Sequence, residues 1–154
     1  RYIVLDVTFA LPKKWRPVLI YQGLNGEVFA DANAVMDRVL SIRASKLPDW
    51  KILGNAGSFF HNPVVDPEFA KRVEGSPRHL QSDGRVKLSA AWLIDACGLK
   101  DKRIGGASVY EHHALILVNH GDATFENVLS LAKLVQTTVY ERFGVSLVQE
   151  PLTF

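Results

Sequence analysis

The chain has 154 residues, of which 47% are hydrophobic and 22% are charged, and its formal net charge is +2. This composition is typical of a globular domain that buries a sizeable core, so it excludes a disordered chain, and its mixed charges lack the basic stripe of nucleic-acid-binding proteins. Because no apolar run approaches roughly 20 residues and there is a single cysteine, we expect a soluble cytoplasmic protein without a membrane span or an internal disulfide.

The first predicted element is a strand over residues 2–10, in which Ile3, Leu5 and Val7 alternate with the side chains of the other face. The chain begins inside this strand with Arg1 and not with an initiator methionine. We therefore expect a fragment whose first strand continues a sheet built by upstream residues.

A helix is predicted next, from the N-cap Asp31 to the residues before Pro48. Its apolar residues Val35, Val39 and Ile42 recur at helical spacing. The helix ends with two cations, which complement the helix dipole without any further role. These two residues are Arg43 and Lys46.

A glycine-rich segment at residues 54–57 leads into Ser58. Its glycines allow backbone conformations that are closed to other residues and a close approach to a ligand, which leaves the Ser58 hydroxyl free to point into a cleft. A hydroxyl group in such a place can donate or accept a proton. On pattern alone, Ser58 is also explained as a plain turn residue.

Helices and a few strands alternate in the remainder of the chain. We expect helices over residues 67–73, 89–97 and 124–143, with Gly98 and Gly144 ending the last two. Paired strands are predicted at residues 107–110 and 114–118, a closing strand at residues 145–149, and a turn-rich passage between Gly75 and Gly84. The predicted fold class is α+β, a small layered domain with helices packed on a mixed or antiparallel sheet.

Three kinds of site have only partial signatures. The neighbours His112 and His113 suggest a metal site, but adjacent residues of a strand point to opposite faces and no further ligand lies at a known spacing. The glycine-rich segment matches neither the P-loop nor the dinucleotide fingerprint. A hydrolase nucleophile is disfavoured because two phenylalanines follow Ser58.

The segment from Arg43 to Asn62 reads Arg-x-x-Lys-Leu-Pro-Asp and then Gly-Asn-Ala-Gly-Ser-Phe-Phe-x-Asn-Pro. It closely resembles the UDP-N-acetylenolpyruvoylglucosamine reductases of bacterial peptidoglycan synthesis. The segments 91–95, 105–107 and 114–119 and the residue Glu150 follow in the same order as in the C-terminal portion of that family. The resemblance covers essentially the whole chain.

The resemblance implies part of an NADPH-dependent oxidoreductase, in which bound FAD delivers hydride to the enolpyruvyl group of UDP-N-acetylglucosamine enolpyruvate and UDP-N-acetylmuramate is formed. It assigns residues 1–45 to the last strand or strands of the FAD-binding domain with a connecting loop and helix, and residues 46–154 to the C-terminal substrate-binding domain. Because the upstream domain of the same polypeptide binds most of the FAD, we expect the isolated chain to be inactive.

The resemblance also implies roles for single residues. Ser58 corresponds to a proton donor, and Glu150 to a glutamate beside the carboxylate of the intermediate; without the resemblance, Glu150 is an exposed acid at a strand end. The implied UDP-sugar contacts are Tyr21, Lys46, Asn62, His79 and His113, and relatives often carry tyrosine and glutamine at the last two positions. The implied cofactor contacts are Arg43, Gly54, Asn55 and Gly57, with Arg43 facing either flavin or a substrate phosphate. No metal is implied.

Tyr21 and Asn62 also fit purely structural roles. Tyr21 can be a loop residue whose ring packs on its neighbours, and Asn62 can start the turn before Pro63. A different class of function for the chain is a non-catalytic nucleotide-sugar-binding or protein-binding domain that retains the scaffold. A third possibility is a flavin-dependent oxidase of related architecture.

Overall fold

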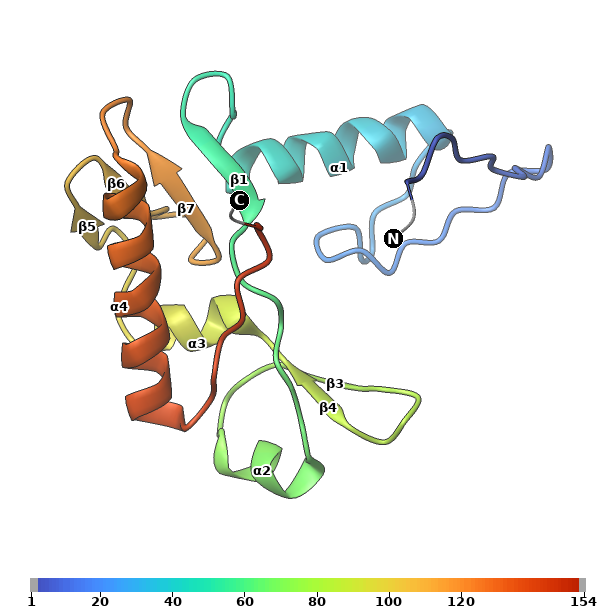
Figure 1. The fold of residues 1–154 in the computed structure, drawn as a ribbon. Helices are drawn as coiled ribbons and strands as arrows, with labels where there is room; N and C mark the ends of the chain where they lie inside the picture. The colour runs from blue at the N-terminus through green and yellow to red at the C-terminus, as the bar shows by residue number, and fades with distance from the viewer. Residues whose placement is uncertain (1–2, 153–154) are drawn as a thin grey trace. The chain divides into compact units, whose positions relative to one another are not determined.

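The structure is a computed structural model that describes residues 3–152 (Figure 1). The chain divides into two compact units, Arg1–Ser45 and Lys46–Phe154. The assignment of these parts to a flavin-binding and a substrate-binding domain stays a prediction. Within the described residues, no helix is both long enough and apolar enough to cross a membrane.

Helix α1 (Ala32–Lys46) follows a long irregular segment, and all of its residues except Lys46 belong to the first unit. The Asp31 carboxylate accepts a hydrogen bond from the backbone N–H of Ala34 at 2.9 Å, which confirms the predicted N-cap. Ile42 is the buried residue of the helix, and the Leu24 side chain is buried in the preceding loop. An added Cβ at Gly23 would lie 3.0 Å from Ile42 Cδ1, so this loop packs closely on the helix.

The strand predicted over residues 2–10 is wrong for the residues that the structure describes. Residues 3–10 form no strand, and their side chains are exposed; Tyr2 lies outside the described residues. The alternating pattern is present, but a strand also needs a neighbour that accepts and donates its backbone hydrogen bonds, and the described chain supplies none here.

The second unit contains a four-stranded antiparallel sheet in the order β1-β7-β6-β5. The strands β6 and β7 confirm the predicted pair, whereas β1 was expected to be a glycine-rich loop. The bounds are Gly54–Ser58 for β1, Arg103–Ile104 for β5, Ala107–Val109 for β6 and Ile116–Asn119 for β7. Strand β1 lies at an edge of this sheet.

A second, three-stranded antiparallel sheet has the order β2-β4-β3. It includes a hairpin where the sequence predicted only a turn-rich passage. The bounds are Val64–Val65 for β2, Arg78–Leu80 for β3 and Val86–Leu88 for β4. The short helix α2 (Pro67–Arg72), which was predicted, contacts β4.

Helices α3 (Ala90–Ala96) and α4 (Phe125–Phe143) confirm the other two predicted helices. Helix α4 packs on β5, β6 and α3 (Figure 1). Thr124 and Asn127 form a capping box at its start, and Gly144 ends it with a left-handed φ of 69°. The core of the unit includes Leu131, Val135 and Val139 on α4, together with Leu93 and Ile94 on α3.

The closing strand predicted over residues 145–149 does not form. Its residues make one isolated antiparallel bridge, between Gln149 and Phe60. The backbone N–H of His61 donates to Val148 O at 2.9 Å, and that of Glu150 donates to Phe59 O at 3.0 Å. This segment therefore does pair with a neighbouring segment, but the pairing is too short to make a strand.

Candidate active site

Ser58 is the last residue of β1, and a bulge precedes it. Asn55 pairs with Val118 and Ser58 with Ile116, so β1 has one residue more than β7 over this interval. Gly57 lies in the bulge with φ 73°, a left-handed conformation that favours glycine. An added Cβ at Gly57 would meet no atom of the described chain within 4 Å, so the space beside this backbone is open.

Ser58 lines an open hollow of about 470 Å³. The hollow brings together both predicted catalytic residues and one predicted substrate contact, which come from β1, from the segment after it and from the C-terminal segment. Phe60 and Leu115 contribute to its apolar part. Its lining residues are Ser58, Phe60, His61, Asn62, Val64, Lys87, Leu115 and Glu150.

Glu150 reaches this hollow through the bridge between Phe60 and Gln149. Phe59 and Phe60 are 7% and 1% exposed, and their rings pack edge to face with centroids 5.2 Å apart. These buried rings anchor the segment whose Phe59 carbonyl oxygen accepts a hydrogen bond from the backbone N–H of Glu150. The carboxylate of Glu150 lies 3.6 Å from Nδ1 of His61, measured to Oε2. The tertiary pairing, not the local sequence, places Glu150 beside Ser58.

Asn62 lines the same hollow and also supports α3. Its side-chain oxygen accepts a hydrogen bond from the backbone N–H of Ala90 at 2.9 Å, at the first residue of that helix. Ser89 accepts a second one from the N–H of Trp92 at 3.2 Å. Asn62 therefore has a structural role besides the predicted substrate contact. The bond to Ala90 uses its side-chain oxygen and not its amide nitrogen.

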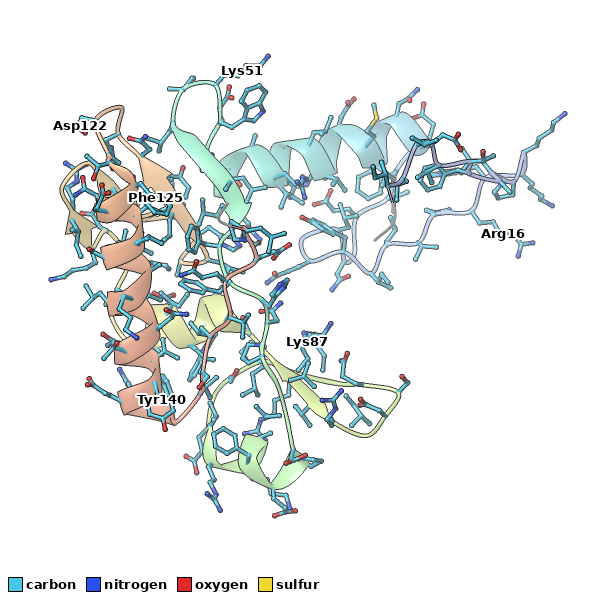
Figure 2. All side chains as sticks on the ribbon, in the orientation of Figure 1. Arg16, Lys51, Lys87, Asp122, Phe125 and Tyr140 are labelled. Carbon is cyan, nitrogen blue, oxygen red and sulfur yellow. The ribbon has the colours of Figure 1, made fainter. Side chains whose placement is uncertain are left out.

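Lys87 stands in the middle of the three-stranded sheet, where it pairs with Val64 on one side and with His79 on the other. Residues directly opposite in neighbouring strands share one face of a sheet. Val64 and Lys87 line the hollow, and His79 is exposed one strand further along the same row. Figure 2 shows the Lys87 side chain extending from β4. The structure thus puts Lys87, not His79, on the wall of the hollow.

His113 lies in the turn before β7 and is partly buried. Burial lowers the pKa of its imidazole, and the positive charges of Lys100 and Lys46 lower it further, although a backbone hydrogen bond acts in the opposite direction. Nδ1 accepts the N–H of Leu115 at 3.4 Å, which assigns the ring proton of the neutral form to Nε2. Leu115 itself lines the hollow. His113 is therefore a neutral donor near the site.

Lys46, the last residue of α1, is exposed, and its positive charge contributes to the lowered pKa of His113. Tyr21 and Arg43 belong to the first unit and are both exposed. Their predicted contacts with the UDP-sugar and with flavin or phosphate stay predictions.

A family model described as "UDP-N-acetylenolpyruvoylglucosamine reductase, C-terminal domain" matches residues 48–154. The chain belongs to this family.

Reductases with the same description from Paraburkholderia xenovorans and Paraburkholderia phytofirmans are 47% and 48% identical to the chain over 99% of its length. These alignments cover 47% of each relative, so the chain spans about half the length of the curated relatives that it matches. A crystal structure of the Thermus caldophilus reductase is 27% identical, with a TM-score of 0.48 over 77% of this chain and 34% of that one.

A second hollow of about 290 Å³ borders strand β1 and has a mainly apolar lining, with Gly54, Asn55, Ala56, Phe59, Leu117, Val118, Asn119 and Val128 as its residues. Asn55 uses its side chain locally, accepting from Gly57 N at 3.0 Å and donating to Leu53 O at 2.9 Å. Gly54 and Asn55 line this hollow and Gly57 does not, and the cofactor contacts predicted for these three residues stay predictions.

Two residues of the hollow, His61 and Lys87, could not be singled out from the sequence of this family member. His61 occupies the unspecified position of the Phe-Phe-x-Asn-Pro segment, so the motif drew no attention to it. Lys87 follows the Asp83-Gly84 dipeptide, which is typical of a hairpin turn and could have predicted the two strands. The pairing of the second of these strands with β2 was not visible from sequence.

Proposed function

We propose that the protein containing this chain reduces the enolpyruvyl group of UDP-N-acetylglucosamine enolpyruvate to form UDP-N-acetylmuramate, a cytoplasmic step of peptidoglycan synthesis, with NADPH as reductant and FAD as cofactor. The observation that carries this proposal is the meeting of Ser58 and Glu150 in one hollow, although they are far apart in the sequence. Membership of the reductase family supports the same reaction.

The reaction requires a hydride and a proton to be added across the alkene. When bound, FAD would supply this hydride to the terminal carbon, with NADPH as the reductant. The carbon beside the carboxylate then has carbanion character, and the Ser58 hydroxyl donates the proton that it needs. A hydroxyl is a weak acid, so this role depends on proximity to a strongly basic carbon. Ser58 lines the hollow directly after the bulge at Gly57, where the space beside the backbone is open.

Glu150 works on the carboxylate end of the substrate in this proposal. In its protonated form the Glu150 carboxyl group donates a hydrogen bond to the substrate carboxylate, which gains negative charge as hydride arrives. The hydrogen bond from the Glu150 N–H to the Phe59 carbonyl oxygen holds the main chain of Glu150 in place, while its side chain remains exposed in the hollow. Glu150 therefore combines a fixed main chain with an accessible carboxyl group.

Cationic and polar groups at the site suit the charges of a nucleotide sugar. Lys87 and Asn62 line the hollow, and Lys46 and His113 belong to the same unit. The ammonium groups pair with diphosphate or carboxylate oxygens, while the neutral imidazole of His113 offers a hydrogen-bond donor. These residues are the proposed substrate contacts of the second unit.

The test is NADPH oxidation by the full-length protein, with and without UDP-N-acetylglucosamine enolpyruvate, in wild type and in Ser58→Ala. We expect substrate-dependent oxidation, and a fall in kcat of about 10²- to 10⁴-fold in the variant, because a positioned proton donor contributes that much. The control is Ser130→Ala, which removes an exposed hydroxyl on α4 and leaves kcat unchanged. Oxidation that needs no UDP-sugar would indicate a flavin oxidase, and unreduced turnover in Ser58→Ala would remove the proton-donor role.

A further inference from the structure

His61 and Glu150 share one face of a very short antiparallel pairing. The bridge between Phe60 and Gln149 has a backbone hydrogen bond on either side, from His61 N to Val148 O and from Glu150 N to Phe59 O. Side chains alternate between the two faces along such a pairing, so the residues on either side of the bridge project together from the other face. His61 and Glu150 are diagonal neighbours on that face, and both line the hollow of Ser58.

The imidazole of His61 lies beside the carboxyl group of Glu150. Nδ1 of His61 is 3.6 Å from Oε2 of Glu150, and no other basic side chain of residues 3–152 is within salt-bridge distance of it. Both side chains are about half exposed, so the pair contributes little to folding stability. Its consequence is therefore local, and it concerns the direction in which the Glu150 carboxyl group points.

The proposed function brings a second carboxylate, that of the substrate, next to Glu150. Two carboxylates in one small site repel each other unless one is protonated or a positive group lies beside them. In the proposed function the Glu150 carboxyl group is the protonated one, so it has to point toward the substrate carboxylate in order to donate its hydrogen bond. Lys87 lines the same hollow, but within the part of the chain that the structure describes it pairs with no acidic group, which leaves it available for the ligand.

We propose that His61 is a positioning residue for Glu150: its imidazole lies beside the Glu150 carboxyl group and holds that group over the hollow, where it meets the substrate carboxylate. This inference rests on the proposed function. It assigns His61 no contact with the reacting carbon, so its effect reaches turnover through Glu150 alone.

The experiment is a double-mutant cycle in the full-length protein, with His61→Phe, Glu150→Gln and the double variant. We expect His61→Phe to lower kcat about tenfold in the Glu150 background and to have almost no further effect in the Glu150→Gln background, because coupled residues are not additive. Calorimetric titration with the UDP-sugar in the absence of NADPH should give a Kd within about threefold of wild type, since a positioning role affects turnover more than binding. His61→Asn, which keeps a polar nitrogen beside the Glu150 carboxyl group, should recover most of kcat.

A matched control is present elsewhere in the chain. His112 lies 3.6 Å from Glu111, with the same side-chain exposure of 57% as His61, but outside the residues that line the hollow. His112→Phe should leave kcat and Kd unchanged. This control separates the loss of an exposed histidine from the loss of the group beside Glu150.

The outcomes distinguish the two proposals. If wild type oxidises NADPH only with the UDP-sugar, and the effects of His61→Phe and Glu150→Gln multiply independently, the proposed function stands and the positioning role of His61 is wrong. The same conclusion follows if His61→Asn is as slow as His61→Phe. A wild-type protein without substrate-dependent oxidation would overturn both the function and the role of His61.

Discussion

The two sides of the second unit are built in different ways. On one side, α4 covers β5 and β6, and its residues Leu131, Val135 and Val139 are completely buried. On the other side, the hollow of Ser58 is formed where β1 bulges and where the C-terminal segment makes a single bridge. The first side has many apolar contacts and regular caps, whereas the second is held by a few backbone hydrogen bonds in front of two buried phenylalanines. Different residues therefore determine the folding stability and the proposed chemistry, so a substitution on one side should change one property and leave the other near wild type.

The largest expected effect on folding belongs to the packed side. Leu131→Ala removes a fully buried side chain from the core, so we expect the free energy of unfolding to fall by about 2–5 kcal/mol. Urea denaturation of the full-length protein measures this change, and kcat of the fraction that remains folded should stay near wild type. Ser130→Ala, on the same helix but exposed, is the control. A selective loss of kcat at unchanged stability would contradict the separation of the two sides.

An intermediate effect is expected at the bulge. Gly57→Ala places a side chain at φ 73°, which costs about 1–2 kcal/mol, and it also shifts Ser58. Gly84→Ala is the matched control, because Gly84 has φ 82° and, like Gly57, has no atom of the described chain within 4 Å of an added Cβ. Both variants should lose similar stability in thermal denaturation. Only Gly57→Ala should lower kcat, by about tenfold, since small displacements of a reacting group are costly. Equal kcat values in the two variants would show that the bulge does not position Ser58.

The smallest expected effect is the pH dependence of stability at His113. Its pKa is lowered in the folded chain, mainly by burial, so the unfolded chain binds a proton more readily. This contribution to stability is complete above the ordinary value of 6.5 and is lost as the pH falls toward the lower folded value. His113→Gln cannot titrate there, so wild type should lose more stability than this variant between about pH 7 and pH 5. Urea denaturation of both proteins at several pH values measures this difference. If both lose the same stability between pH 7 and pH 5, the burial of His113 does not make stability depend on pH.

Sequence patterns predicted the helices of this chain well because their signals are local. Thr124 caps α4, Ser89 caps α3, and Gly144 ends α4 in the conformation that glycine favours. Each of these signals acts within one or two helical turns. The family motif likewise drew attention to Ser58 and Asn62, which the structure places in one hollow. Their roles in binding and proton transfer stay predictions.

The errors concern strands, whose formation depends on a partner elsewhere in the chain. Residues 3–10 alternate like a strand and form none among the described residues, while the glycine-rich residues 54–57 belong to β1 because β7 pairs with them. Periodicity describes which face a residue would occupy, but not whether a neighbouring strand is available. The same limitation hid Lys87, whose place on the hollow depends on its pairing with Val64.

The sequence by itself determined the family, the helices with their caps, and the residue types that proton transfer requires, because these depend on neighbours along the chain. Only the tertiary structure decided that Glu150 lines the same hollow as Ser58, that His61 lies beside Glu150, and that Lys87 lies on the wall of the hollow. Those arrangements depend on strand register and on the burial of Phe59 and Phe60, which link distant segments through hydrogen bonds and packing that no local pattern encodes.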